Sequence, residues 1–210
     1  MTEAEGRSAL VITISDGVAT GVREDVSGAR VEERLAGLGF AVERRVVPDD
    51  RAAIEAALIE GAARHRLVVS TGGTGLTPRD VTPQATRAVI DYDVPGLAEA
   101  MRAHGRATTP LADLSRAVVG VRGRTLIVNL PGNPKGALES LDAIVRVLEH
   151  AIETLAGPYD HSITTKGGEP ARCSTRSPRF PPTHWSSRSS GARSRCSSSC
   201  WRGACGSSPP

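Results

Sequence analysis

The chain has 210 residues, of which 39% are hydrophobic and only 3% aromatic, so a core of ordinary domain size must be built from aliphatic side chains. No apolar run approaches the roughly 20 residues of a membrane-spanning helix. The polar, acidic start also lacks the pattern of a secretory signal. We therefore expect a cytoplasmic protein with no membrane partner.

Positive charge is concentrated near the C-terminus. The formal net charge is +3, but residues 159–210 carry eight Lys or Arg against two acidic residues, which leaves 18 basic against 21 acidic residues in 1–158. The first 158 residues are therefore slightly acidic, and a specific nucleic-acid partner is not expected for them. All four cysteines also fall within residues 159–210, so we expect neither a disulfide nor a thiolate metal site in the folded part.

Strand-like and helix-like segments alternate along the chain. Continuous apolar runs predict strands buried on both faces, and apolar residues at helical spacing predict amphipathic helices. In chain order we expect a strand at 9–15, a helix at 27–39, a strand at 40–47, a helix at about 51–65, a strand at 67–69, helices at 82–90 and 95–104, strands at 117–121 and 125–130, and a helix at 135–156. The short connection between the last two strands requires them to be antiparallel.

Capping residues predict where several helices begin and end. Ser27 is the expected N-cap of the first helix. Thr82 followed by Pro83 is typical of an N-cap with proline at the first helical position. Gly105 is expected to end the helix at 95–104.

The alternation of strands and helices predicts an α/β fold with three layers, α/β/α, around a mostly parallel sheet with one antiparallel strand. Ligands of such sheets bind beyond the carboxyl ends of the strands, where the strand order reverses. Four polar or glycine-rich segments follow predicted strand ends, namely Ser15-Asp16, Pro48-Asp49-Asp50, residues 71–75 and Pro131-Gly132-Asn133. Parallel strands would bring these four segments to one edge of the sheet.

Residues 66–84, R-L-V-V-S-T-G-G-T-G-L-T-P-R-D-V-T-P-Q, are the most informative stretch. A buried strand leads directly into three glycines, which can adopt positive φ and let backbone N–H groups converge on phosphate oxygens. Asp80 places a carboxylate beside this anion-attracting loop, and a Mg²⁺ ion would reconcile the two because it bridges carboxylate and phosphate oxygens. A purely structural turn is the alternative for a glycine-rich motif taken alone.

Other residues at this edge have structural alternatives as well. Asp16 could simply turn the chain, Asp49 could cap the second helix, and residues 131–134 could be a rigid connection. His65 and His104 each end a helix, where a cation suits the helix dipole, and we predict structural roles for both. The joint placement of carboxylates and phosphate-binding loops favours phosphoryl chemistry with a metal ion.

The string T-G-G-T-G-x-T-P-R-D-x-T-P resembles the signature of the molybdenum-cofactor biosynthesis family of the MogA and MoaB type. The resemblance covers residues 8–157 and includes Ser15-Asp16, Pro48-Asp49, Leu114-Ser115-Arg116 and residues 131–134. It implies transfer of AMP from ATP to the terminal phosphate of molybdopterin, with release of pyrophosphate and with Mg²⁺ as cofactor. It also implies a homotrimer, and a molybdenum-insertion protein as the partner that takes the product.

The resemblance assigns catalysis and metal binding to Asp49 and Asp80. The implied substrate-binding residues are Ser15, Asp16, Thr71, Gly72, Gly73, Thr74, Gly75, Ser115, Pro131, Gly132, Asn133 and Lys135. Gln84 departs from the family pattern, in which an acidic residue commonly follows Thr-Pro. Two alternative functions are a non-catalytic molybdopterin-binding module and a nucleotide pyrophosphatase on the same fold.

Two regions follow from these observations. Residues 8–158 form the expected molybdopterin-binding domain. Residues 159–210 are rich in Ser, Arg and Pro, a composition that buries too little apolar surface to order itself. We expect them to be either a disordered extension or a frame-shifted reading of the gene, and to be dispensable for folding and catalysis.

Overall fold

The computed structural model describes residues 7–157 and contains a six-stranded sheet of order β2-β1-β3-β6-β5-β4. Its strands are β1 (Ser8–Ile14), β2 (Ala41–Val47), β3 (Leu67–Thr71), β4 (Tyr92–Asp93), β5 (Val119–Arg122) and β6 (Thr125–Leu130). Its helices are α2 (Asp16–Ala19), α3 (Val26–Ala36), α4 (Arg51–Arg64), α5 (Thr82–Val89), α6 (Pro95–Arg106) and α7 (Pro134–Ala156), with a 3₁₀ helix η1 (Pro110–Leu114). The predicted region at 159–210 lies outside the described residues.

The sheet is mostly parallel, as the sequence predicts. Strands β2, β1, β3 and β6 are parallel neighbours, whereas β5 is antiparallel to both β6 and β4. Among the strands of residues 7–157, β5 alone therefore runs against the others, which confirms the expected single antiparallel strand. β2 lies at the sheet edge, and its largely exposed, charged sequence suits an edge that resists pairing with another chain.

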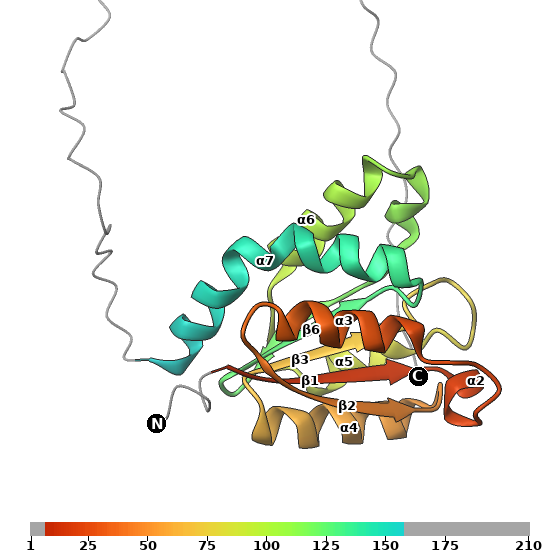
Figure 1. The fold of residues 1–210 in the computed structure, drawn as a ribbon, viewed down its shortest axis with the longest axis horizontal. Coiled ribbons are helices and arrows are strands. Elements are labelled where there is room, and N and C mark those ends of the chain that lie inside the picture. The colour runs from red at the N-terminus through yellow and green to blue at the C-terminus, as the bar shows by residue number, and fades with distance from the viewer. Residues whose placement is uncertain (1–6, 158–210) are drawn as a thin grey trace, which may run out of the picture. The chain divides into compact units, whose positions relative to one another are not determined.

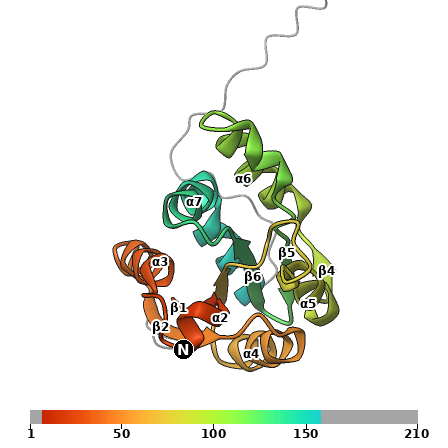
Figure 2. The ribbon, with the colours of Figure 1, turned by 90° about the vertical axis from the view of Figure 1, so that its right-hand side faces the viewer.

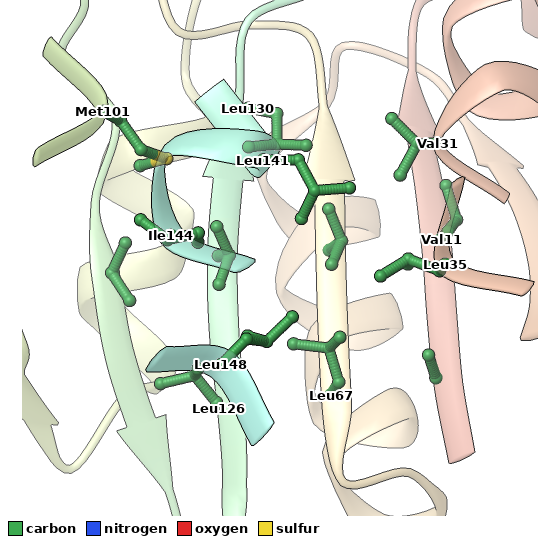
Figure 3. Packing of buried hydrophobic residues seen from close by; sticks show 14 of the residues in the cluster. Val11, Val31, Leu35, Leu67, Met101, Leu126, Leu130, Leu141, Ile144 and Leu148 are labelled. Atoms are coloured by element: carbon green, nitrogen blue, oxygen red, sulfur yellow. The ribbon is translucent and has the colours of Figure 1, made fainter. Parts of the chain in front are cut away.

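Helices cover both faces of the sheet, so the three-layer prediction is confirmed (Figures 1 and 2). Side chains alternate along β1: Val11 packs in the core beneath α3 and α7, whereas Leu10 and Ile12 pack against α4 and α5. Figure 3 shows Leu141 and Ile144 of α7 lying over the sheet. Both cores are aliphatic, as expected from the low aromatic content.

Two predicted helix caps are wrong, each because a neighbouring residue or loop competes for the same bond. Asp25, not Ser27, caps α3, and its carboxylate accepts a 2.9 Å hydrogen bond from the Gly28 N–H. Thr82 is the first residue of α5 rather than its cap, and its hydroxyl donates a 2.9 Å hydrogen bond to the Gly72 carbonyl. The hydroxyl therefore links the loop of residues 71–75, here called the glycine loop, to α5 instead of capping the start of the helix.

The predicted stop at Gly105 is also wrong, because α6 continues to Arg106. A Cβ at Gly105 would lie only 2.8 Å from the Cβ of Ala112 in η1. The glycine is thus needed for close packing between α6 and η1, not for a helix end. The short elements α2, β4 and η1 have too little periodicity to be predicted from the sequence.

His65 lies directly after α4, but its environment does not favour the expected cation. Burial lowers the pKa of its imidazole, and the nearby Glu43 carboxylate, 3.4 Å away, only partly opposes this effect. The neutral form is therefore favoured. Across residues 7–157, no helix has the length and apolar character needed to cross a membrane.

Candidate active site

The four loops singled out in the sequence meet at the edge where the parallel strands end. The strand register places Ile14 beside Val47, and Thr71 beside both Thr13 and Leu130. The segments that follow β1, β2, β3 and β6 therefore start at the same height. Figure 2 views the molecule from this edge, with the helices on the two sides of the sheet. The strand order also reverses at β1, because β2 pairs with one side of β1 and β3 pairs with the other.

The structure requires glycine at two positions of the loop after β3. Gly72 and Gly73 have φ values of 107° and 63°, which L side chains rarely adopt. A Cβ on Gly72 would lie 2.2 Å from the Ile14 carbonyl oxygen, and one on Gly73 would lie 2.3 Å from the Thr82 hydroxyl. Gly75 is different, since its φ is not positive and a Cβ would lie 3.0 Å from an Asp80 carboxylate oxygen.

The two threonines of this loop are both buried. The Thr71 hydroxyl donates a 3.0 Å hydrogen bond to the Pro131 carbonyl, which ties the end of β3 to the loop after β6. Gly132 completes this junction, because a Cβ there would lie 3.2 Å from the Gly72 Cα. Substrate contact by Thr71 therefore stays a prediction, and its hydroxyl serves the loop junction in this structure.

Asp16 and Asp49 hold each other in place after β1 and β2. The Asp16 N–H donates to the Asp49 carboxylate over 2.9 Å, and the Asp49 N–H donates to the Asp16 carboxylate over 3.0 Å. The hydrogen bond from Asp49, together with the ion pair to Arg79, lowers the pKa of Asp16. Asp50, not Asp49, caps α4, accepting from the Ala53 N–H. The capping alternative for Asp49 is thus excluded.

Asp80 is held at the other end of the glycine loop. Its Oδ2 accepts hydrogen bonds from the Thr77 N–H at 2.8 Å and from the Thr77 hydroxyl at 2.6 Å. Burial acts to raise the pKa of Asp80, but the hydrogen bonds from Thr77 and Gly75 and the charge of Arg116 outweigh it, so the pKa is lowered. Asp80 is consequently a fixed, ionised carboxylate.

Asp49 and Asp80 both approach the glycine loop. Asp49 Oδ1 lies 3.6 Å from the position that a Cβ on Gly73 would take, and Asp80 Oδ2 lies 3.0 Å from the equivalent position on Gly75. No group of three His, Cys, Asp or Glu side chains gathers into a metal cage within residues 7–157. Two carboxylates beside this glycine loop fit Mg²⁺, which is usually bound by one or two carboxylates together with substrate phosphates and water.

A cavity of about 590 Å³ opens beside the glycine loop, a volume within the range of small-molecule sites. Its walls come from the glycine loop, the loop after β6, the start of α7, and from α6 and η1. The predicted site residues that line it are Gly73, Thr74, Gly75, Asp80, Ser115, Pro131, Gly132, Asn133 and Lys135. Those that do not line it are Ser15, Asp16, Asp49, Thr71 and Gly72.

The far wall of the cavity is largely apolar. Met101 of α6 and Leu111 and Leu114 of η1 contribute to it, and Leu111 and Leu114 are half or more exposed. Lys135 and Arg102 supply positive charge, with Lys135 lying 3.8 Å from Glu139. Asp80 and Glu139 bring negative charge to the same lining, so the apolar wall suits a ligand ring and the charged side chains suit its polar groups.

Three arginines at the site carry contacts that the sequence reasoning did not assign. Arg79 pairs with Asp16, Arg102 donates to the carbonyls of residues 115 and 117, and Arg116 donates to the glycine loop. Arg79 lies in the T-P-R-D string and Arg116 lies in the L-S-R string of the family pattern. Their place in these strings was the signal that could have identified them as site residues. Arg102 carried no such signal, because it lies on an ordinary amphipathic helix.

This arrangement is that of an α/β protein whose candidate site for a phosphate-bearing small molecule lies at the carboxyl edge of its sheet. Residues 10–150 match the family described as a probable molybdopterin binding domain, and the chain belongs to that family. A molybdopterin adenylyltransferase of Helicobacter pylori strain J99 is 39% identical over 156 residues, which cover 71% of this chain and 88% of that protein. The molybdopterin adenylyltransferase of Escherichia coli K12 is 40% identical over 166 residues, covering 71% and 85%.

Solved structures agree with this assignment. The molybdopterin biosynthesis enzyme MoaB from Thermus thermophilus is similar with a TM-score of 0.68 and 47% identity, covering 73% of this chain and 99% of that one. The molybdopterin biosynthesis Mog protein from Mycobacterium ulcerans is similar with a TM-score of 0.68 and 42% identity, covering 71% and 99%. The resemblance to the MogA and MoaB type is therefore confirmed.

Proposed function

We propose that this chain is a molybdopterin adenylyltransferase, which transfers AMP from ATP to the terminal phosphate of molybdopterin and releases pyrophosphate. One observation carries the proposal: two carboxylates, Asp49 and Asp80, flank a glycine loop beside a cavity large enough for a substrate. The two relatives described above that are named for this activity are 39% and 40% identical, and they are matched over 88% and 85% of their length. The transferase is thus a nucleotidyltransferase that acts in molybdenum cofactor biosynthesis.

The reaction joins two phosphates and needs little proton transfer. A terminal phosphate oxygen of molybdopterin attacks the α-phosphorus of ATP, and the bond from that phosphorus to the bridging oxygen breaks. The electron pair leaves with pyrophosphate. Because the attacking phosphate is already ionised near neutral pH, no histidine base is required. Alignment and charge stabilisation are the main tasks of the protein.

The residues of the site divide these tasks. The backbone N–H group of Gly73 would orient phosphate oxygens, and Lys135 lies at the cavity to offset negative charge. The apolar far wall takes a substrate ring. Asp49 and Asp80 would hold Mg²⁺. When bound, Mg²⁺ would neutralise phosphate charge as a Lewis acid.

We infer a homotrimer and a molybdenum-insertion protein that receives the adenylylated product, and both inferences rest on the family resemblance alone. The cytoplasmic location that we infer rests on the sequence pattern instead. Light scattering of the purified protein tests the trimer, because a monomeric mass at micromolar concentration would contradict it. Co-purification of a molybdenum-insertion protein, dependent on the adenylylated product, tests the partner.

The two alternative functions predict different products. Purified protein is incubated with ATP and Mg²⁺, with and without molybdopterin, and pyrophosphate and adenylylated pterin are measured. Adenylyl transfer predicts equal amounts of both products, and only when molybdopterin is present. Tight pterin binding without product would identify a binding module, whereas nucleotide hydrolysis without pterin would identify a pyrophosphatase.

A further inference from the structure

Arg116 makes three hydrogen bonds to the segment that carries Asp80. Its backbone N–H donates to the Thr74 carbonyl over 3.0 Å, and its Nε donates to the Gly75 carbonyl over 2.7 Å. Its Nη2 donates to the carbonyl of Asp80 itself. One residue from the segment between η1 and β5 therefore spans both ends of the loop at residues 75–80.

The planar shape of the guanidinium makes this bridge possible. Two nitrogens held in one rigid fork reach two carbonyls at a fixed separation, which a lysine ammonium on a flexible stem cannot reproduce. The backbone on both sides of Arg116 is also held in place. Arg102 of α6 donates through one nitrogen to the carbonyls of Ser115 and Ala117, at 3.4 and 3.3 Å, which flank Arg116.

The loop has few other anchors to the rest of the protein. Thr77 and Asp80 bond to each other, which shapes the loop but does not fix its position. Within residues 7–157, one other polar side-chain contact joins this loop to the rest of the protein, and it is the ion pair of Arg79 with Asp16. Both of those side chains are substantially exposed, and such pairs contribute little to stability. The position of the loop therefore depends mainly on Arg116.

We propose that Arg116 is a positioning residue for the transfer reaction, which fixes the Asp80 loop at the distance from the glycine loop and the cavity that catalysis needs. Arg116 does this through backbone carbonyls and without contacting the substrates. The inference rests on the proposed function, since it assigns Asp80 its role in adenylyl transfer. A shift of about 1 Å in a catalytic group can cost about 100-fold in rate, so loss of the bridge should act on kcat.

The test compares Arg116→Lys with Arg122→Lys. Arg122 also donates to a backbone carbonyl, that of Val89, but it lies at the end of β5 that points away from the site. We expect kcat of Arg116→Lys to fall by about 10-fold to 100-fold, with KM for each substrate changing less than kcat. Arg122→Lys should keep the wild-type kcat. Arg116→Ala should regain part of its rate when a soluble guanidinium compound is added, as a small cation that fits the vacated space.

A second measurement is independent of activity. Hydrogen exchange at the Thr77 and Asp80 amides should be faster in Arg116→Lys than in wild type, while exchange in β1, β3 and β6 stays unchanged. Wild-type kcat together with wild-type exchange in Arg116→Lys would overturn the inference. If the wild-type protein shows no adenylyl transfer, the proposed function fails, and the exchange comparison alone still decides whether Arg116 positions the loop.

Discussion

Replacing Gly73 by alanine should displace the glycine loop, because the structure leaves no room for a methyl group there. Gly73 has a φ of 63°, and an L residue in that left-handed region costs about 1–2 kcal/mol. The new Cβ would lie 2.3 Å from the Thr82 hydroxyl oxygen, and such overpacking costs about 1–3 kcal/mol. We therefore expect Gly73→Ala to lower the free energy of unfolding by about 2–5 kcal/mol.

A double-mutant cycle separates the two contributions. Thr82→Ala removes the clashing oxygen, and the next atom, the Thr82 Cβ, would lie 3.4 Å from the new methyl group. Thr82→Ala by itself should cost about 1 kcal/mol, since it loses the hydrogen bond to the Gly72 carbonyl. The double variant should then be less destabilised than the sum of the two single variants by about 1–3 kcal/mol.

Urea unfolding of the four proteins measures these differences, and adenylylation per folded molecule is measured on the same samples. Gly96→Ala is the matched control, because Gly96 lies in α6 with open space where its Cβ would be. It should be neutral or slightly stabilising, since alanine favours a helix over glycine. A loss under about 0.5 kcal/mol in Gly73→Ala, or strictly additive values in the cycle, would refute the reasoning.

The remaining predictions concern charge, pH and the C-terminal region. Asp80→Asn keeps the shape but removes the charge, so we expect kcat to fall by orders of magnitude while pterin binding measured by calorimetry survives; unchanged turnover would remove Asp80 from the mechanism. The lowered pKa of His65 means that the unfolded chain binds a proton more readily, so stability should fall as the pH drops below about 6.5 and level off below the folded-state pKa. His65→Gln should show a smaller fall between pH 7.5 and 5.5 in urea titrations, and equal curves would contradict this. A chain ending at Gly157 should match full length in melting temperature and adenylylation rate, whereas a loss of several degrees would show that residues 158–210 pack on the domain.

The fold was predictable because its main signals are local. The apolar runs of β1, β3 and β6 and the glycine loop after β3 each lie within a few residues of sequence, so strand ends and their edge followed from alternation alone. The helix caps were less predictable. Asp25 and Ser27 are both good capping residues, and only the completed backbone decides between them.

The errors at Thr82 and Gly105 have a tertiary cause. The Thr82 hydroxyl bonds to Gly72, ten residues earlier, and Gly105 is required by Ala112 of η1. Neither contact leaves a local pattern. The partners of Arg79 and Arg116 were hidden for the same reason, since a long side chain can reach many carbonyls and its choice depends on how distant loops meet.

The most direct test of the central claim follows the α-phosphate of ATP. Purified protein is incubated with ATP labelled at the α-phosphate, Mg²⁺ and molybdopterin, and the label is traced by chromatography in wild type and in Asp80→Asn. The proposed function predicts that wild type moves the label onto the pterin in amounts equal to the pyrophosphate released, and that Asp80→Asn moves almost none. Label that is released as free AMP or remains in intact ATP, with molybdopterin unmodified, would contradict the proposed function.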